Sequence, residues 1–155
     1  MALNPWIRLF VYGLLGLMYE ITFTALWDLV QSNFATLSLK GYSSIWSFFI
    51  YGSCTFCGEK FYNLYKPKFS AFTRGLVYMQ MAYSWEFVSG LILRRFNACT
   101  WDYTDFRLDV MGLIALEYAP MWFLTGLFQE FIYDYLFSLS HCQHKRCFVN
   151  GDIPE

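Results

Sequence analysis

The sequence predicts an all-α integral membrane protein with four transmembrane helices. Of its 155 residues, 57% are hydrophobic and 23% aromatic, and only 15% are charged. Soluble domains are usually about 45–50% apolar and about 25% charged. Most of the charged residues lie in gaps and tails between apolar runs, and these runs are long enough to cross a bilayer, which needs a helix of about 20 residues. We therefore expect lipid to be the solvent for these runs, in a chain long enough for one domain.

The helices are expected at residues 6–30, 42–62, 72–93 and 110–135, within a transmembrane domain over residues 1–137. In the first run, Trp6 and Trp27 are placed as interfacial anchors. A cleaved signal peptide is the rival for this run. Its apolar region would be shorter and a small-residue cleavage site would follow it, whereas this chain has Glu20 and bulky residues there.

The later runs differ in character. The second is rich in Ser, Cys and Gly, which suits a helix packed closely against other helices. The third ends at Arg94 and Arg95 and leads into a polar, aromatic loop. The fourth carries Pro120, a residue that can kink a helix. Residues 138–155 are expected to form a loose cytosolic tail.

The basic residues predict the orientation. If the N-terminus is cytosolic, seven basic residues fall on the cytosolic side, namely Arg8, Lys60, Lys66, Lys68, Arg74, Lys145 and Arg146. The other side holds four, which are Lys40, Arg94, Arg95 and Arg107. By the positive-inside rule, this split favours both termini in the cytosol.

The two halves of the chain carry a faint internal similarity. Glu20 and Glu86 each follow an aromatic residue, and Tyr51-Gly52 resembles Tyr118-Ala119 at nearly the same offset. Two duplicated helical hairpins would explain these matches. The alternative is chance similarity between apolar helices.

Three acids inside the apolar runs are candidates for a shared site: Glu20, Glu86 and Glu117. At about 1.5 Å of rise per residue, all three reach a similar depth in the outer half of the membrane. Each lies on a stripe of mostly small or polar residues at helical spacing. The stripes are Gly16, Glu20, Thr24 and Asp28; Glu86, Gly90 and Arg94; and Glu117, Met121, Thr125 and Gln129.

Two interpretations of these acids stay open. Three carboxylates in one polar cavity, beneath the loop of residues 97–109, would titrate as a coupled set and could hold a proton, a cation or an amine-bearing headgroup. Alternatively, each acid is protonated or hydrogen-bonded to a neighbouring helix and only fixes packing. An acid at the membrane centre costs about 2.5–3.5 kcal/mol, a cost that normally implies a partner or a function.

The candidate polar site comprises Glu20, Glu86, Glu117, Asp28, Arg94, Arg95, Asn97, Trp101 and Asp102. Within this set, the two arginines could pair with Asp102 or Asp105, or bind lipid phosphate. The alternative is that they mark the membrane boundary and extend their charged ends to the interface. Trp85 and Trp122 lie inside predicted helices, where core packing is the default.

Cysteine and histidine predict no metal site and no cofactor. The spacing of Cys54 and Cys57 is that of a redox motif, but no βαβ pattern surrounds it. Four possible zinc ligands in the tail are too cramped for more than adventitious binding, and they are His141, Cys142, His144 and Cys147. The two cysteines of that set are also candidate palmitoylation sites. These two histidines are the only ones in the sequence, which argues against a histidine-based intramembrane enzyme.

Two stretches, FNACTWDY at residues 96–103 and DVMGLIALEYA at residues 109–119, resemble the transmembrane protein 229 family. The aromatic-Glu pair at residues 85–86 and the segment FIYG at residues 49–52 add to the resemblance, which extends from the first helix to about Phe131. The B-type branch is the most similar by overall length. The resemblance implies a small multi-pass membrane protein, and the chain is also similar to a bacterial group named as ABC-transporter membrane components. Neither resemblance implies an activity for particular residues.

We expect a non-enzymatic binding or accessory subunit in a membrane complex. Its partners would be the lipid bilayer and either further copies of the chain or another membrane subunit. With a net charge of −1 and no large basic cluster, nucleic acid is not an expected partner. The sequence contains no glycine-rich phosphate loop, so an ATP-driven role would need a separate subunit. The alternative is a small transport component or a lipid-modifying enzyme that uses the intramembrane carboxylates.

Overall fold

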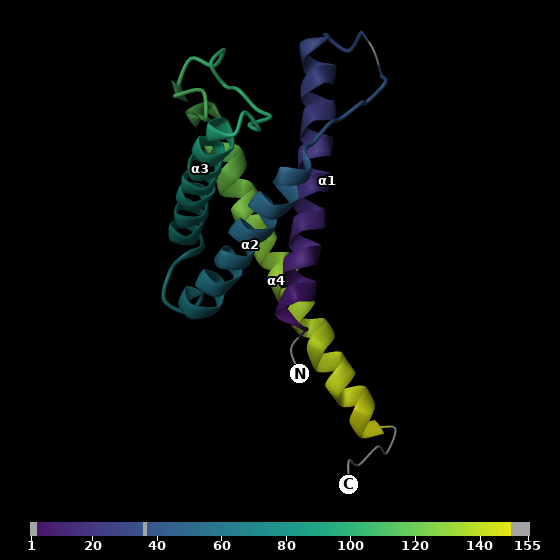
Figure 1. The fold of residues 1–155 in the computed structure, drawn as a ribbon. Helices are drawn as coiled ribbons and strands as arrows, with labels where there is room; N and C mark the ends of the chain where they lie inside the picture. Colours follow the sequence, from purple (N-terminus) through teal and green to yellow (C-terminus); the bar gives the residue numbers. More distant parts are fainter. Residues whose placement is uncertain (1–2, 36, 150–155) are drawn as a thin grey trace.

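The computed structural model describes residues 3–35 and 37–149, with side chains described as far as Leu139. Its long helices, α1 (Pro5–Gln31), α2 (Ile45–Tyr65), α3 (Ala71–Arg95) and α4 (Ala119–Val149), run alternately up and down (Figure 1). The start of α1 and the far half of α4 lie toward the same end of the molecule as the turn between α2 and α3. The predicted all-α class is thus confirmed for the described residues, apart from a short hairpin between α3 and α4.

Side-chain caps explain where the first three helices begin. The side chain of Asn4 accepts a hydrogen bond from the backbone N–H of Trp6, and Pro5 occupies the first turn of α1, where its missing N–H costs nothing. Ser44 caps α2 and Ser70 caps α3 in the same way. Because Ser44 is the cap, α2 begins at Ile45 and not at residue 42 as expected.

The fourth helix begins at Ala119, not at Val110. Before it, β1 (Asp109–Val110) pairs with β2 (Ile114–Ala115) in an antiparallel hairpin, and the 3-10 turn η1 (Leu116–Tyr118) follows. The hairpin turns through Met111 and Gly112, which have φ angles of 57° and 63°. Asp109 Oδ2 accepts a hydrogen bond from the backbone N–H of Gly112 at 2.7 Å and stabilises this turn.

Helix α4 also continues further than expected, to Val149 and beyond the predicted domain end at residue 137. The physical reason is that no Gly or Pro interrupts the chain between Gly126 and Gly151. Pro120 lies in the first turn of α4, where a proline is tolerated. At this position it has no reason to kink the helix, as the sequence analysis had considered. The side chains of His141, Cys142, His144 and Cys147 lie outside the described side chains.

Close contacts at glycines join the helices into two hairpins, α1 with α2 and α3 with α4. A Cβ added at Gly16 would lie 2.3 Å from Tyr51 Cβ, and one added at Gly52 would lie 3.2 Å from Gly13 Cα. In the second hairpin, a Cβ added at Gly126 would lie 2.4 Å from Tyr78 Cβ. Such contacts let backbones approach closely, as small residues do between membrane helices.

In the described part of the chain, α1 is the one helix long and apolar enough to cross a membrane. Helix α3 is as long as a membrane span, but it carries Arg74 and Glu86 and ends at two further arginines. The arrangement of four membrane-crossing helices therefore stays a prediction.

Candidate functional site

A cavity of about 1270 Å³ lies among the four helices. Tyr12, Tyr78 and Tyr133, which come from α1, α3 and α4, line one end of it. At the other end, the lining includes Tyr42–Ser44 from the α1–α2 loop and residues 100–103, 105 and 106 from the α3–α4 loop. Both hairpins therefore contribute walls to the same space.

The ionisable side chains with a formal charge in the described lining are all acidic: Glu20, Glu86, Asp102 and Asp105. No Lys, Arg or His belongs to that part of the lining. Most of the remaining lining is aromatic or aliphatic. Charge in this cavity is therefore negative, and the cavity is suited to a cationic group rather than an anion.

Glu86 is the most buried of these acids, with 7% of its surface exposed. Its Oε1 accepts a hydrogen bond of 2.8 Å from the hydroxyl of Tyr103, in the α3–α4 loop. Burial, reinforced by the nearby Glu86, raises the pKa of Tyr103, so the phenol stays protonated and can donate. Glu86 Oε2 is buried and has no hydrogen-bond partner among the described residues.

Glu20 lines the same cavity from α1. Its Oε2 accepts a hydrogen bond of 2.7 Å from Ser43 Oγ, in the α1–α2 loop. Each acid is thus held by a hydroxyl from the loop that follows its own helix. Glu20 is also close enough to act electrostatically on Glu86, so two of the three predicted acids share one site.

Aromatic rings close the side of the cavity between α1 and the α3–α4 loop. The Phe23 ring lies 5.3 Å from that of Tyr118, and the Trp27 ring lies 5.8 Å from that of Phe106. Tyr103 joins the same cluster, 5.6 Å from Phe106. Burial raises the pKa of Tyr118 to about 12. Trp27, expected as an interfacial anchor, therefore contributes to the cavity wall.

Two hydrogen-bond donors on α4 also belong to residues of the lining. Trp122 Nε1 and Gln129 Nε2 are buried and have no hydrogen-bond partner among the described residues. They lie two helical turns apart on one face of α4. Trp122 was expected in core packing, and its ring lies 6.2 Å from that of Tyr51. Residues of the described lining thus carry one unpaired buried acceptor, on Glu86, and two unpaired buried donors, on Trp122 and Gln129.

Three other predicted site residues line neither the cavity nor the second pocket described next. Glu117 is exposed, and its Oε1 accepts a hydrogen bond of 2.8 Å from the backbone N–H of Leu108. It stays outside because the chain turns through the hairpin before α4 begins, so Glu117 belongs to the exposed 3-10 turn η1 and not to a face of α4. Asp28 and Arg95 are exposed as well.

The remaining predicted residues gather at a second pocket of about 290 Å³, lined by Arg94, Asn97, Cys99, Trp101 and Asp102. Arg94 Nη2 lies 3.5 Å from Asp102 Oδ1, and Arg94 also donates to the carbonyl of Met111. Of the alternatives considered for Arg94, pairing with Asp102 is the one that the structure contains. Both side chains are at least partly exposed, so this pair contributes only about 0–1 kcal/mol.

A buried triad at the start of α1 was missed in the sequence. Arg8 Nη1 lies 2.9 Å from Glu59 Oε1, and the Tyr12 hydroxyl donates to Glu59 Oε2 at 2.6 Å. Glu59, on α2, is 0% exposed. In the sequence analysis, Arg8 had served only as a charge for predicting orientation.

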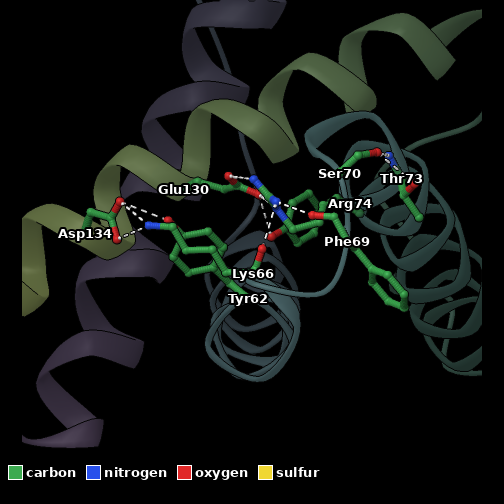
Figure 2. A network of polar contacts seen from close by, with 9 residues as sticks. Tyr62, Lys66, Phe69, Ser70, Thr73, Arg74, Glu130 and Asp134 are labelled. Carbon is green, nitrogen blue, oxygen red and sulfur yellow. Dashed lines mark hydrogen bonds and ion pairs between the residues drawn. The ribbon is translucent and has the colours of Figure 1, made fainter.

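The second hairpin repeats the same triad (Figure 2). Arg74 Nε and Nη2 donate to the two oxygens of Glu130 at 2.7 and 2.8 Å, and the Tyr78 hydroxyl donates to Glu130 Oε1 at 2.9 Å. Beside it, Lys66 Nζ lies 3.0 Å from Asp134 Oδ2. These contacts tie the turn between α2 and α3 to α4.

A sequence signal for both triads exists. Residues 8–20 (RLFVYGLLGLMYE) and residues 74–86 (RGLVYMQMAYSWE) share Arg, then Val-Tyr, then an aromatic residue followed by Glu, at identical spacing. The Arg and Tyr of each copy belong to a triad, and the final Glu of each copy lines the cavity. Glu20 and Glu86 therefore occupy the same position of this shared sequence pattern.

Comparison with known protein families matches residues 7–149 to a family described as "Putative ABC-transporter type IV". No solved structure matches the chain.

Proposed function

Because the chain belongs to this ABC-transporter-related family, whose members are membrane-associated, we propose that it is a multi-pass binding subunit of a membrane transport complex. In this proposal all four helices cross the bilayer and both termini are cytosolic. The subunit is not an enzyme. It holds a ligand in the cavity between its two hairpins.

The cavity is the observation that carries this function. Ligand sites are usually concave, mostly apolar spaces of about 300–1,000 Å³ with a few well-placed polar groups. The present cavity, of about 1270 Å³, has aromatic walls and a single deeply buried acid, Glu86. Hydroxyl groups hold both Glu86 and Glu20 in place and fix their orientation in the site.

Exposed apolar side chains support the membrane location. Along α1, seven large hydrophobic residues are between 44% and 60% exposed: Ile7, Phe10, Leu14, Met18, Ile21, Leu26 and Val30. Exposed apolar patches of this extent usually mark a lipid or protein contact. The distribution of basic residues, with seven on the cytosolic side and four on the other side, supports the orientation.

The repeated triads support two duplicated hairpins. Helices α1 and α3 run in the same direction, so the copies would be parallel repeats, related by an axis along the membrane normal. A ligand site at the interface between repeats is common in transporters. The proposal also agrees with the resemblance to the transmembrane protein 229 family, which implies a small multi-pass membrane protein.

A transport role would need partners. The sequence has no phosphate-binding loop, so ATP hydrolysis would come from another subunit. The rival function is a lipid-modifying enzyme that uses the same carboxylates. The rival differs from the proposed function in one respect: an enzyme would turn over lipid without any transport partner.

The test is native mass spectrometry of the tagged full chain, purified from its own membranes in mild detergent. The proposal predicts a complex well above the 18.4 kDa of one chain, containing a further membrane subunit in fixed ratio. Glu86→Gln should leave that complex intact. A lone monomer that converts lipid, and loses this activity in Glu86→Gln, would establish the rival instead.

A further inference from the structure

We infer that the cavity binds an amphipathic ammonium ion that carries an N–H group, an apolar body and no phosphate or carboxylate. This inference rests on the proposed binding function and names the class of its ligand. Glu86 would accept a hydrogen bond from the ammonium, and the aromatic walls would enclose the apolar body.

The charge of the cavity selects a cation. All four charged side chains in its described lining are acidic. Arg94, outside that lining, pairs with Asp102 at 3.5 Å, whereas Glu20, Glu86 and Asp105 have no basic partner among the described residues. A ligand with its own phosphate or carboxylate would place that anion beside Glu20 and Glu86, with no Lys or Arg in the described lining to pair with it. Burying such an unpaired charge is costly. A ligand with a single positive charge meets no such penalty.

The hydrogen bonds of Glu86 select an N–H. One oxygen is occupied by Tyr103, whereas Oε2 is buried with no partner among the described residues. A buried acceptor without a donor costs free energy, and an ammonium N–H removes that cost through a charge-assisted bond. A quaternary ammonium has no N–H and would leave Oε2 unpaired.

The walls select the rest of the ligand. Tyr51, Trp85, Trp101 and Tyr103 line the cavity together with Glu86, and aromatic faces attract organic cations as well as apolar groups. The unpaired donors Trp122 Nε1 and Gln129 Nε2 call for a neutral acceptor on the ligand, such as a carbonyl, sulfonyl or ether oxygen.

The probe for this inference is dansylcadaverine, a fluorescent primary amine with an aromatic ring, a pentyl chain and sulfonyl oxygens. The full chain would be placed in nanodiscs of phosphatidylcholine, a lipid whose headgroup has no N–H, and empty nanodiscs would supply the background. We expect saturable, blue-shifted dansyl emission. The N-acetylated probe, which is neutral, and the trimethylammonium analogue, which lacks the N–H, should each bind at least about tenfold more weakly.

Variants locate the site. Glu86→Gln should weaken dansylcadaverine binding by at least about tenfold, whereas Asp28→Asn, an exposed acid of α1 outside the cavity lining, should bind as the wild type does. The comparison of the three probes on the wild-type chain needs no variant, so the test survives if Glu86→Gln does not fold. Equal binding of the three probes would overturn the inference, as would unchanged binding in a folded Glu86→Gln protein.

A second nanodisc composition separates free amines from lipid amines. Adding phosphatidylethanolamine, which has a primary ammonium next to a phosphate, should leave dansylcadaverine affinity unchanged. Competition by this lipid would overturn the exclusion of phosphate-bearing ligands. Failure of probe binding in a chain that still assembles with its partner would refute this inference alone. Probe binding by a chain that is a lone monomer would refute only the accessory-subunit function.

Discussion

Tyr103 and Glu86 join the α3–α4 loop to the middle of α3 through a hydrogen bond of 2.8 Å between the phenol and Oε1. The bond fixes the carboxylate of Glu86 and, at the same time, holds the loop against one end of the cavity. The equivalent contact in the first hairpin, between Ser43 and Glu20, has a length of 2.7 Å. The two glutamates of the cavity are therefore oriented by the loops that enclose it.

Tyr103→Phe should destabilise the protein by about 1–3 kcal/mol, because it leaves Glu86 with a second unpaired oxygen in a buried site. The measurement is unfolding by sodium dodecyl sulfate from mild detergent, followed by tryptophan fluorescence. Tyr135→Phe is the matched control, since Tyr135 is 61% exposed and its hydroxyl makes no hydrogen bond within the described residues. Equal stability of the two variants would show that the Tyr103 bond contributes nothing.

The buried triad of the first hairpin should be far more sensitive than the exposed pair of Lys66 and Asp134, which joins the end of α2 to α4. Glu59→Gln leaves the buried charge of Arg8 uncompensated, at an expected loss of about 3–5 kcal/mol. Lys66→Ala breaks a pair whose side chains are 50% and 56% exposed, and should cost only about 0–1 kcal/mol. The same unfolding assay measures both. The double variant Arg8→Met with Glu59→Met should recover much of the loss, since neither charge is then stranded.

Gly16→Ala should weaken the α1–α2 contact by about 1–3 kcal/mol. The new Cβ would lie 2.3 Å from Tyr51 Cβ, so the two helices must move apart. Gly52→Ala provides a graded comparison, because its Cβ would meet its nearest atoms at 3.2 Å and should cost less. Unfolding curves of both variants test this order. A Gly16→Ala protein as stable as the wild type would show that the close packing of this hairpin is not required.

The predicted orientation can be measured by cysteine labelling. In a variant that keeps Cys99 alone, a membrane-impermeant maleimide should react from the outside of intact cells, since Cys99 lies in the α3–α4 loop and is only partly buried. A variant that keeps Cys147 alone should react only after permeabilisation. The reverse pattern would mean that the termini face the outside.

Three of the four helices could be predicted closely from the sequence, because polar caps and turns such as Asn4, Ser44 and Ser70 flank the apolar runs. The fourth start was missed since residues 110–118 are apolar enough to resemble a helix. A local signal was present in Asp109 and Gly112, because the Asp109 side chain accepts a hydrogen bond from the backbone N–H of Gly112 within the turn.

The candidate site was predicted in part. Depth along a straight helix brought Glu20 and Glu86 together, and both line the cavity. The same argument failed for Glu117, which lies at the surface. Estimating its depth assumed a continuous helix from residue 110, whereas the chain forms the hairpin and η1 before α4 begins. The triads escaped notice because Arg8 and Arg74 were considered as orientation charges rather than as partners of Glu59 and Glu130.

A double-mutant cycle on Glu20 and Glu86 tests the central claim most directly, namely that the two hairpins place equivalent acids in one binding cavity. Dansylcadaverine affinity would be measured for Glu20→Gln, Glu86→Gln and the double variant in phosphatidylcholine nanodiscs. We predict a coupling above about 0.5 kcal/mol, because residues that share a site are non-additive. Strictly additive effects, or a Glu20→Gln protein that binds the probe as the wild type does, would contradict the shared cavity.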